Sequence, residues 1–141
     1  MATHLLKTEP STYSFDDLVR EKRARWDGVS NAAALINLRA IRKGDDLLIY
    51  HSGEDKAVVG LARALSDAYE DPARPGTTPD GRPKFAVVDL APLKGAKTPV
   101  TLAAIKADAR FKELGLVRIS RLSVMPVPAP MDRALRVIAG L

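Results

Sequence analysis

The chain has 141 residues, of which 46% are hydrophobic and 28% are charged, a balance that excludes a wholly disordered chain and fits one domain over residues 1–141. It has no cysteine, which excludes disulfide scaffolds, cysteine-based zinc sites, iron–sulfur clusters and thiol nucleophiles. The net charge of +5 divides into +3 over residues 1–43, −2 over 44–109 and +4 over 110–141, which is compatible with a basic face for a polyanion and equally with a basic protein that binds none.

The first third of the chain predicts one strand followed by two helices. Residues 3–7 predict a short strand that stops before Pro10, because proline cannot donate to a strand ladder. Ser14 is a suitable N-cap for a helix through about residue 23. A second helix fits residues 31–42, which have an apolar face, basic residues at the C-terminal end and Gly44 as the expected left-handed stop.

After this glycine the pattern becomes that of strands. Residues 47–50 and 57–65 predict two strands joined by a turn-rich segment, which is typical of a hairpin. The second strand has a face of small residues, Gly60, Ala62 and Ala64, that a helix or a flat ligand could approach closely. Residues 71–83 contain four prolines and two glycines, so we expect a mobile loop near the rim of a binding cleft.

The last part of the chain predicts strands and helices in alternation without regular βαβ units. We expect a strand over residues 84–90, a helix that begins after the cap Thr101, an edge strand over 122–127 and a helix over 131–139. This order indicates an α+β domain built on a small, largely antiparallel sheet or barrel. The expected core contains Leu5, Leu48, Val59, Leu61, Val87 and Val124.

The sequence lacks the common signatures of nucleotide hydrolysis, dinucleotide binding, esterase chemistry and zinc proteolysis. Ser52 adjoins His51, but adjacent strand residues point to opposite faces and rarely form a nucleophile–base pair. The only other histidine, His4, is far away in sequence, so we expect no metal and no other cofactor. No apolar run reaches the roughly 18 residues that span a bilayer, and we expect a cytoplasmic protein without enzymatic activity or membrane contact.

Four segments of polar and aromatic residues stand at the ends of the expected elements. They are Lys7-Thr8-Glu9-Pro10, Trp26-Asp27-Gly28-Val29-Ser30-Asn31, Tyr50-His51-Ser52 and Ser120-Arg121-Leu122-Ser123-Val124. In this order they resemble the motifs of the EVE domain, the family of the thymocyte nuclear protein, and the resemblance covers nearly the whole chain. It implies a PUA-like fold of the α+β class, in which a twisted mixed or antiparallel β pseudobarrel is flanked by helices.

The resemblance also implies a function. PUA-like proteins bind modified bases or RNA, and EVE domains are similar in having a pocket for a flipped modified base. We therefore expect a monomeric, non-catalytic module that binds nucleic acid, DNA or RNA, and recognises a modified base. The site residues that the resemblance implies are Lys7, Thr8, Trp26, Asn31, Tyr50, His51, Ser52, Ser120, Arg121 and Ser123.

Several of these residues have a structural alternative. Trp26, the only tryptophan, could stack on a base or belong to the core. Asn31 could read a base edge or cap a helix. Tyr50 and His51 are neighbours in a strand, so one should lie in the core while the other faces the pocket or solvent. Arg121 could contact a phosphate or be solvated.

The chain departs from the family motifs at His4, Ser30 and Ala32-Ala33, where the family has tryptophan, arginine and Tyr-Gln. These changes remove an aromatic surface, a charge and an amide, so the preferred base could differ. An enzyme or sensor that uses the same pocket for a free nucleotide or another small molecule is the alternative function. A pure protein-interaction domain would need a large exposed apolar patch, and the sequence shows none clearly.

Overall fold

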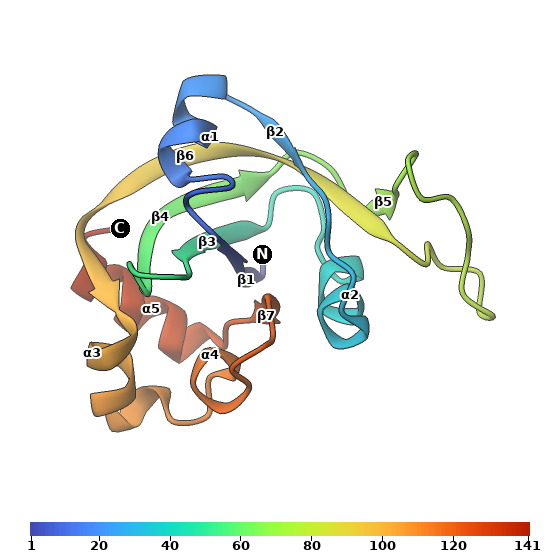
Figure 1. The fold of residues 1–141 in the computed structure, drawn as a ribbon. Coiled ribbons are helices and arrows are strands. Elements are labelled where there is room, and N and C mark those ends of the chain that lie inside the picture. Colours follow the sequence, from blue (N-terminus) through green and yellow to red (C-terminus); the bar gives the residue numbers. More distant parts are fainter.

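The computed structural model describes all residues from Met1 to Leu141 and has a curled, half-barrel sheet at its centre (Figure 1). Six strands follow one another in the order β2-β6-β4-β3-β1-β7, and the short β5 pairs with β6. The strands are β1 (Thr3–Thr8), β2 (Ala24–Trp26), β3 (Asp46–His51), β4 (Ala57–Ala64), β5 (Tyr69–Glu70), β6 (Ala86–Thr101) and β7 (Val124–Pro126). This arrangement confirms the expected mixed pseudobarrel flanked by helices.

One strand pair in the sheet is parallel and the others are antiparallel. β1 runs parallel to β3, with Leu5 opposite Leu48, whereas β7 pairs with β1 in the antiparallel direction and forms one edge of the sheet. A parallel pair needs a long crossover between its strands. Here the crossover contains two helices and β2, and residues of β2 and of the end of β1 line one pocket.

The helices lie around the sheet and begin largely where the sequence predicts. They are α1 (Phe15–Glu21), α2 (Ala32–Arg39), α3 (Leu102–Ala107), α4 (Gly115–Arg118) and α5 (Ala129–Ala139), with a short 3-10 helix at Ala109–Phe111. The N-caps Ser14, Asn31 and Thr101 each accept a hydrogen bond from a backbone N–H of the first turn. Gly140 ends α5 in the left-handed conformation, as expected. No helix has the length and apolar character needed to cross a membrane.

Two elements differ in length from the sequence prediction. α2 ends at Arg39 rather than at residue 42, because the N–H groups of Ala40 and Ile41 already donate to carbonyls three residues earlier. β6 runs on from the expected strand at 84–90 to Thr101, since β2, β4 and β5 all pair with it. Its pairing with β4 shifts register twice, and such bulges bend a strand and help to curl a sheet.

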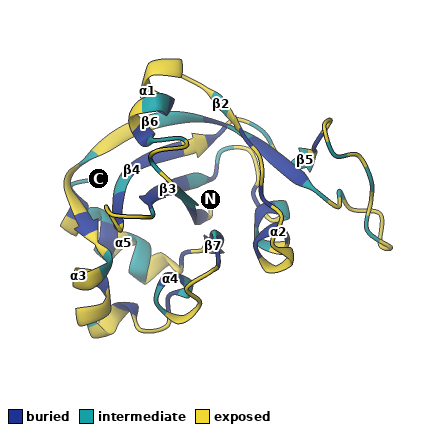
Figure 2. Ribbon diagram, in the orientation of Figure 1, coloured by how far each residue is buried: buried dark blue, intermediate teal, exposed yellow.

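The hydrophobic core lies between the sheet and the helices, where the strands are buried (Figure 2). Five of the six predicted core residues are buried: Leu5, Leu48, Leu61, Val87 and Val124. Val59 is only half-buried, and its neighbour Val58 is fully buried instead, because the register shift next to Gly60 changes which residue faces the core.

The face of small residues on β4 receives an aromatic ring from α1. A Cβ atom added to Gly60 would lie 2.5 Å from the ring carbons of Phe15, so the ring occupies the space that a side chain would need. The sequence predicted a close approach to this face, and the approaching group is the first residue of α1. This contact positions α1, and with it the segment that precedes the helix, over the sheet.

Candidate functional site

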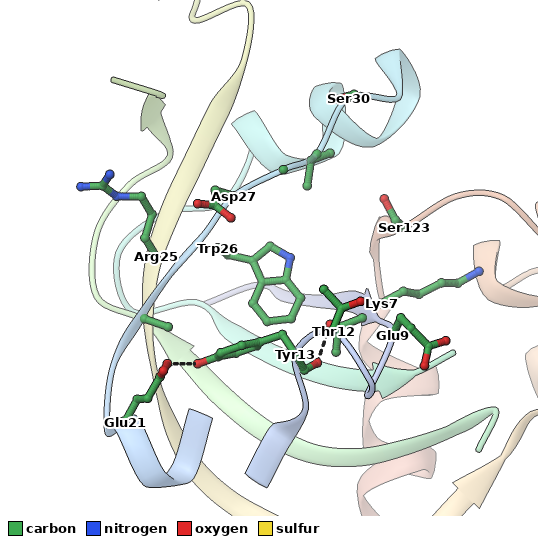
Figure 3. A pocket seen from close by; sticks show the side chains of 14 residues that line it. Lys7, Glu9, Thr12, Tyr13, Glu21, Arg25, Trp26, Asp27, Ser30 and Ser123 are labelled. Carbon is green, nitrogen blue, oxygen red and sulfur yellow. Dashed lines mark hydrogen bonds between the residues drawn. The ribbon is translucent and has the colours of Figure 1, made fainter. Parts of the chain in front are cut away.

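A pocket of about 650 Å³ lies between the end of β1, the segment before α1, and β2 with the residues that follow it (Figure 3). The backbone N–H of Lys7 donates to the carbonyl of Ser123 over 2.9 Å, which brings the C-terminal segment to the same place. The lining residues are Lys7, Thr8, Glu9, Thr12, Tyr13, Glu21, Ala24, Arg25, Trp26, Asp27, Gly28, Val29, Ser30 and Ser123.

Trp26 forms an aromatic wall of this pocket and also belongs to the hydrophobic core. It is 8% exposed, and its backbone pairs with Val88 of β6. The Tyr13 ring meets the indole edge to face, at 6.2 Å between centroids and an angle of 84°. The indole N–H donates to none of the other lining residues (Figure 3). The two interpretations of this tryptophan, core and pocket, are therefore compatible.

The end of β1 supplies polar groups that internal contacts hold in place. The Lys7 ammonium donates to the Ser120 carbonyl over 3.0 Å and lies 5.8 Å from the centroid of the Tyr50 ring. Burial lowers the pKa of Lys7 below its ordinary value. The Thr8 hydroxyl donates to the Tyr13 carbonyl over 2.6 Å, which ties the segment before α1 to the strand. An ammonium has three donors, so Lys7 retains N–H groups for a ligand.

Three carboxylates line the pocket, and two of them have partners in the chain. Glu9 accepts hydrogen bonds of 3.1 Å from the backbone and hydroxyl of Ser11. Glu21 accepts from the Tyr13 hydroxyl over 2.7 Å; burial first, and then this hydrogen bond, raise the pKa of the phenol above its usual range. Asp27 is exposed and has no such partner. No three His, Asp or Glu side chains are arranged to hold a metal ion.

Arg74, from the proline-rich segment 71–83, reaches the rim of the pocket. Its guanidinium donates to the Ser30 hydroxyl over 3.0 Å and to the Val29 carbonyl over 3.2 Å. The Arg74 Nε also donates to the Asp71 carboxylate over 2.9 Å. The guanidinium carbon lies 4.3 Å from the centroid of the Phe85 ring. The segment therefore meets the rim as expected. Ser30 replaces the arginine of the family motif, and Arg74 places another arginine beside this position.

Four of the ten predicted site residues line the pocket: Lys7, Thr8, Trp26 and Ser123. The other six lie outside its lining: Asn31, Tyr50, His51, Ser52, Ser120 and Arg121. Ser120 nevertheless supplies the carbonyl that holds Lys7, and the Ser52 N–H donates to the Thr8 carbonyl over 2.9 Å. Arg121 is exposed. Ser120 and Ser52 thus stand next to the pocket without forming its wall.

The remaining residues outside the lining have structural roles. The Asn31 side chain accepts from the Ala34 N–H over 3.0 Å and caps α2. His51 accepts from the Phe15 N–H over 2.9 Å through Nε2, which leaves Nδ1–H to donate to Asp55 over 3.0 Å. Tyr50 and His51 are both buried. The expectation that one of them faces the pocket or solvent is wrong, because the start of α1 covers the second face of β3.

The lining residues that were not predicted differ in how far the local sequence indicates them. Residues 27–30 belong to the motif that begins at Trp26, so the motif indicated this segment but not that these residues line the pocket. Thr12 and Tyr13 follow the proline turn in a segment without any pattern, and only the fold brings them to the pocket. His4, which replaces the tryptophan of the family motif, is buried and is not a lining residue, so this replacement does not change the pocket wall.

Comparisons with known proteins agree on one family. A sequence model of the EVE domain matches residues 2–135. Human thymocyte nuclear protein 1 is 26% identical over 151 residues, an alignment that covers 87% of this chain and 67% of the relative. An NMR structure of a Rhodopseudomonas palustris protein is similar, with 40% identity, coverage of 99% and 94%, and a TM-score of 0.87. A crystal structure of human THYN1 protein in complex with 5-methylcytosine containing DNA has 26% identity, coverage of 97% of both chains and a TM-score of 0.85.

Proposed function

Because the chain belongs to the EVE domain family, we propose that it is a nucleic-acid-binding module that takes a modified base of DNA into the pocket around Trp26 and performs no reaction on it. The observation that carries this proposal is the indole itself, which forms an aromatic wall of a pocket of about 650 Å³. An unstacked base is held in this manner, by an aromatic face and by hydrogen bonds to its edge. The volume lies in the range of ligand pockets, about 300–1,000 Å³.

The human relative supports DNA and a modified cytosine as the ligand. Its structure contains 5-methylcytosine in DNA, and its fold aligns with this chain over almost the full length of both. Stacking on an aromatic side chain contributes about 1–3 kcal/mol per base. Burial of the cytosine methyl group adds about 0.8 kcal/mol, or roughly fourfold in affinity.

Binding without catalysis is supported by the residues of the wall. Neither histidine lines the pocket: His51 holds the start of α1, and His4 is paired with Asp45 at 2.9 Å. Tyr13 and Glu21 are bound to each other. The proposal includes a monomeric protein in the cytoplasm, as expected from the sequence.

Fluorescence anisotropy with labelled oligonucleotides tests this function. We compare DNA duplexes that differ only in one cytosine or 5-methylcytosine, the matching RNA, and free 5-methyl-dCMP as a competitor, each at low and high salt. We expect the methylated duplex to bind about fourfold more tightly than the unmodified one. Its affinity should fall steeply with salt, because contacts to phosphates release counterions.

Three results would contradict the proposal. If the free nucleotide competes as well as the methylated duplex and binding ignores salt, the pocket serves a small molecule, and the chain is a sensor or an enzyme. If no oligonucleotide binds, the nucleic-acid function is wrong. Tighter binding of the RNA would replace DNA by RNA as the ligand.

A further inference from the structure

Asp27 is the one carboxylate of the pocket wall without a hydrogen-bond partner in the chain. Glu9 is bound to Ser11 and Glu21 to Tyr13, whereas Asp27 takes part in no hydrogen bond or ion pair. It is exposed and lines this pocket, and it also borders a second, smaller hollow that Arg23, Arg25 and Asp89 line. A free acceptor in the wall of a binding pocket is available to a ligand.

The backbone holds this carboxylate beside the aromatic wall. Asp27 follows Trp26, the last residue of β2, and precedes Gly28, whose φ of +78° favours glycine. A Cβ atom at Gly28 would meet nothing within 4 Å, so the space beside this glycine is open. Figure 3 shows the carboxylate at the Trp26 end of the pocket, away from Ser123 and Glu9. A base that stacks on the indole would therefore present its edge near Asp27.

The charges of the wall indicate a base rather than a phosphate at this position. Three carboxylates and only two cationic side chains, Lys7 and Arg25, line the pocket. Arg25 is engaged through its Nε, which donates to the Tyr69 hydroxyl over 3.1 Å. A phosphate near Asp27 would meet a second negative charge, whereas an amino group of a base would supply a donor to it.

We propose that Asp27 selects the base by accepting a hydrogen bond from its exocyclic amino group, so that the pocket prefers an amino-bearing base to the matching carbonyl-bearing base. This inference rests on the proposed function and assigns a specificity-determining residue to it. A carboxylate accepts from the cytosine N4 amino group but repels the O4 carbonyl of thymine.

The experiment compares 5-methylcytosine with thymine, which carry the same methyl group but differ in the hydrogen-bonding edge. Each base stands opposite an abasic position in otherwise identical duplexes, so neither loses a pairing partner when it is extruded. Anisotropy gives the ratio of the two Kd values. For the wild-type protein we expect a ratio of about 5 to 150 in favour of 5-methylcytosine, the range of one good edge contact.

The variant Asp27→Asn should bring this ratio to within about threefold of one, because an amide can both donate and accept. Asp16→Asn is the matched control, since it makes the same charge change on an exposed residue of α1 outside the lining. Its ratio should equal that of the wild type. A comparison of ratios removes the general gain in affinity that any lost negative charge gives to a DNA-binding protein.

The outcomes separate this inference from the proposed function. If the wild type binds both duplexes but without preference, or if Asp27→Asn keeps the full preference, the role of Asp27 is wrong and base binding stands. If neither duplex binds, the proposed function fails together with the inference. Loss of the preference in both Asp27→Asn and Asp16→Asn would assign it to overall charge and would also overturn the role of Asp27.

Discussion

The indole of Trp26 and the phenol ring of Tyr13 stand edge to face, 6.2 Å apart between centroids and at 84°. The Tyr13 hydroxyl is fixed by Glu21 of α1, and the Trp26 backbone is fixed by β6. Both rings are thus held by secondary structure rather than by a ligand. A base that enters meets an aromatic wall that is already formed, and little ordering is needed on binding.

Replacement of Trp26 should separate its two roles. Trp26→Ala removes a large core side chain and should lower the free energy of unfolding by about 3–5 kcal/mol. Trp26→Phe keeps an aromatic ring in the core but reduces the area available for stacking and removes the indole N–H. The fold should therefore persist while the affinity for the methylated duplex decreases. Urea denaturation and anisotropy measure the two effects. Unchanged affinity in a folded Trp26→Phe protein would assign this tryptophan to the core alone.

Gly60 should resist substitution because Phe15 fills the space above it. Gly60→Ala should lower the free energy of unfolding by about 1–3 kcal/mol, the cost of overpacking a core. Gly95, opposite Gly60 on β6, is the matched control, since its added Cβ would lie 3.8 Å from the same ring in ordinary contact. Urea denaturation of Gly95→Ala should show less than half of the Gly60→Ala effect. Equal losses would mean that the ring moves aside freely.

Asp45 should make stability depend on pH. Burial alone would raise the pKa of its carboxyl, but hydrogen bonds from the Arg42 N–H, from His4 and from the Ala2 N–H outweigh it and hold the pKa below its usual value. A depressed folded-state pKa stabilises the protein above the unfolded value of about 3.9, and this stabilisation disappears as the pH falls through the folded value.

The variant Asp45→Asn should therefore lose about 1–3 kcal/mol of stability at pH 7, and the difference from the wild type should shrink below about pH 4. Urea denaturation at several pH values measures this. Glu54→Gln, at an exposed carboxylate without a partner, should change little at any pH. A loss that is constant from pH 7 to pH 3 would show that the charge of Asp45 is not its source.

Arg74 should contribute to binding through the rim that it holds. Arg74→Ala frees the Val29 carbonyl and the Ser30 hydroxyl, and we expect affinity for the methylated duplex to fall about three- to tenfold, near 1 kcal/mol. Arg82→Ala is the control, because this exposed arginine of the same segment pairs only with Asp80. The loss of one positive charge is common to both variants. Equal effects in anisotropy would reduce the role of Arg74 to charge.

Local signals predicted most of the secondary structure, and pairing decided the rest. Caps such as Ser14 and Thr101 act on the next few residues, so the sequence indicates them directly. β2 and β5 have three and two residues, and their own pattern is too short to define a strand. They exist because β6 offers its N–H and carbonyl groups to them.

The site was harder to predict because polar residues near a pocket also serve the fold. Asn31 and His51 carry the right chemistry for reading a base, yet both are used to hold helix N-termini. Tyr13 lies in the wall only because the Phe15 ring packs onto Gly60 and places the start of α1 there. Such tertiary contacts have no counterpart in the local sequence.

The most direct measurement of base binding uses Trp26, the only tryptophan of the chain, as its own reporter. The methylated duplex is added to the wild-type protein while tryptophan fluorescence and the indole N–H resonance are recorded alongside anisotropy. We predict saturable quenching and a shift of the indole resonance, both with the Kd that anisotropy gives, because the base stacks on this ring. If the duplex binds by anisotropy while fluorescence and resonance stay unchanged, the base does not enter this pocket and the account is contradicted.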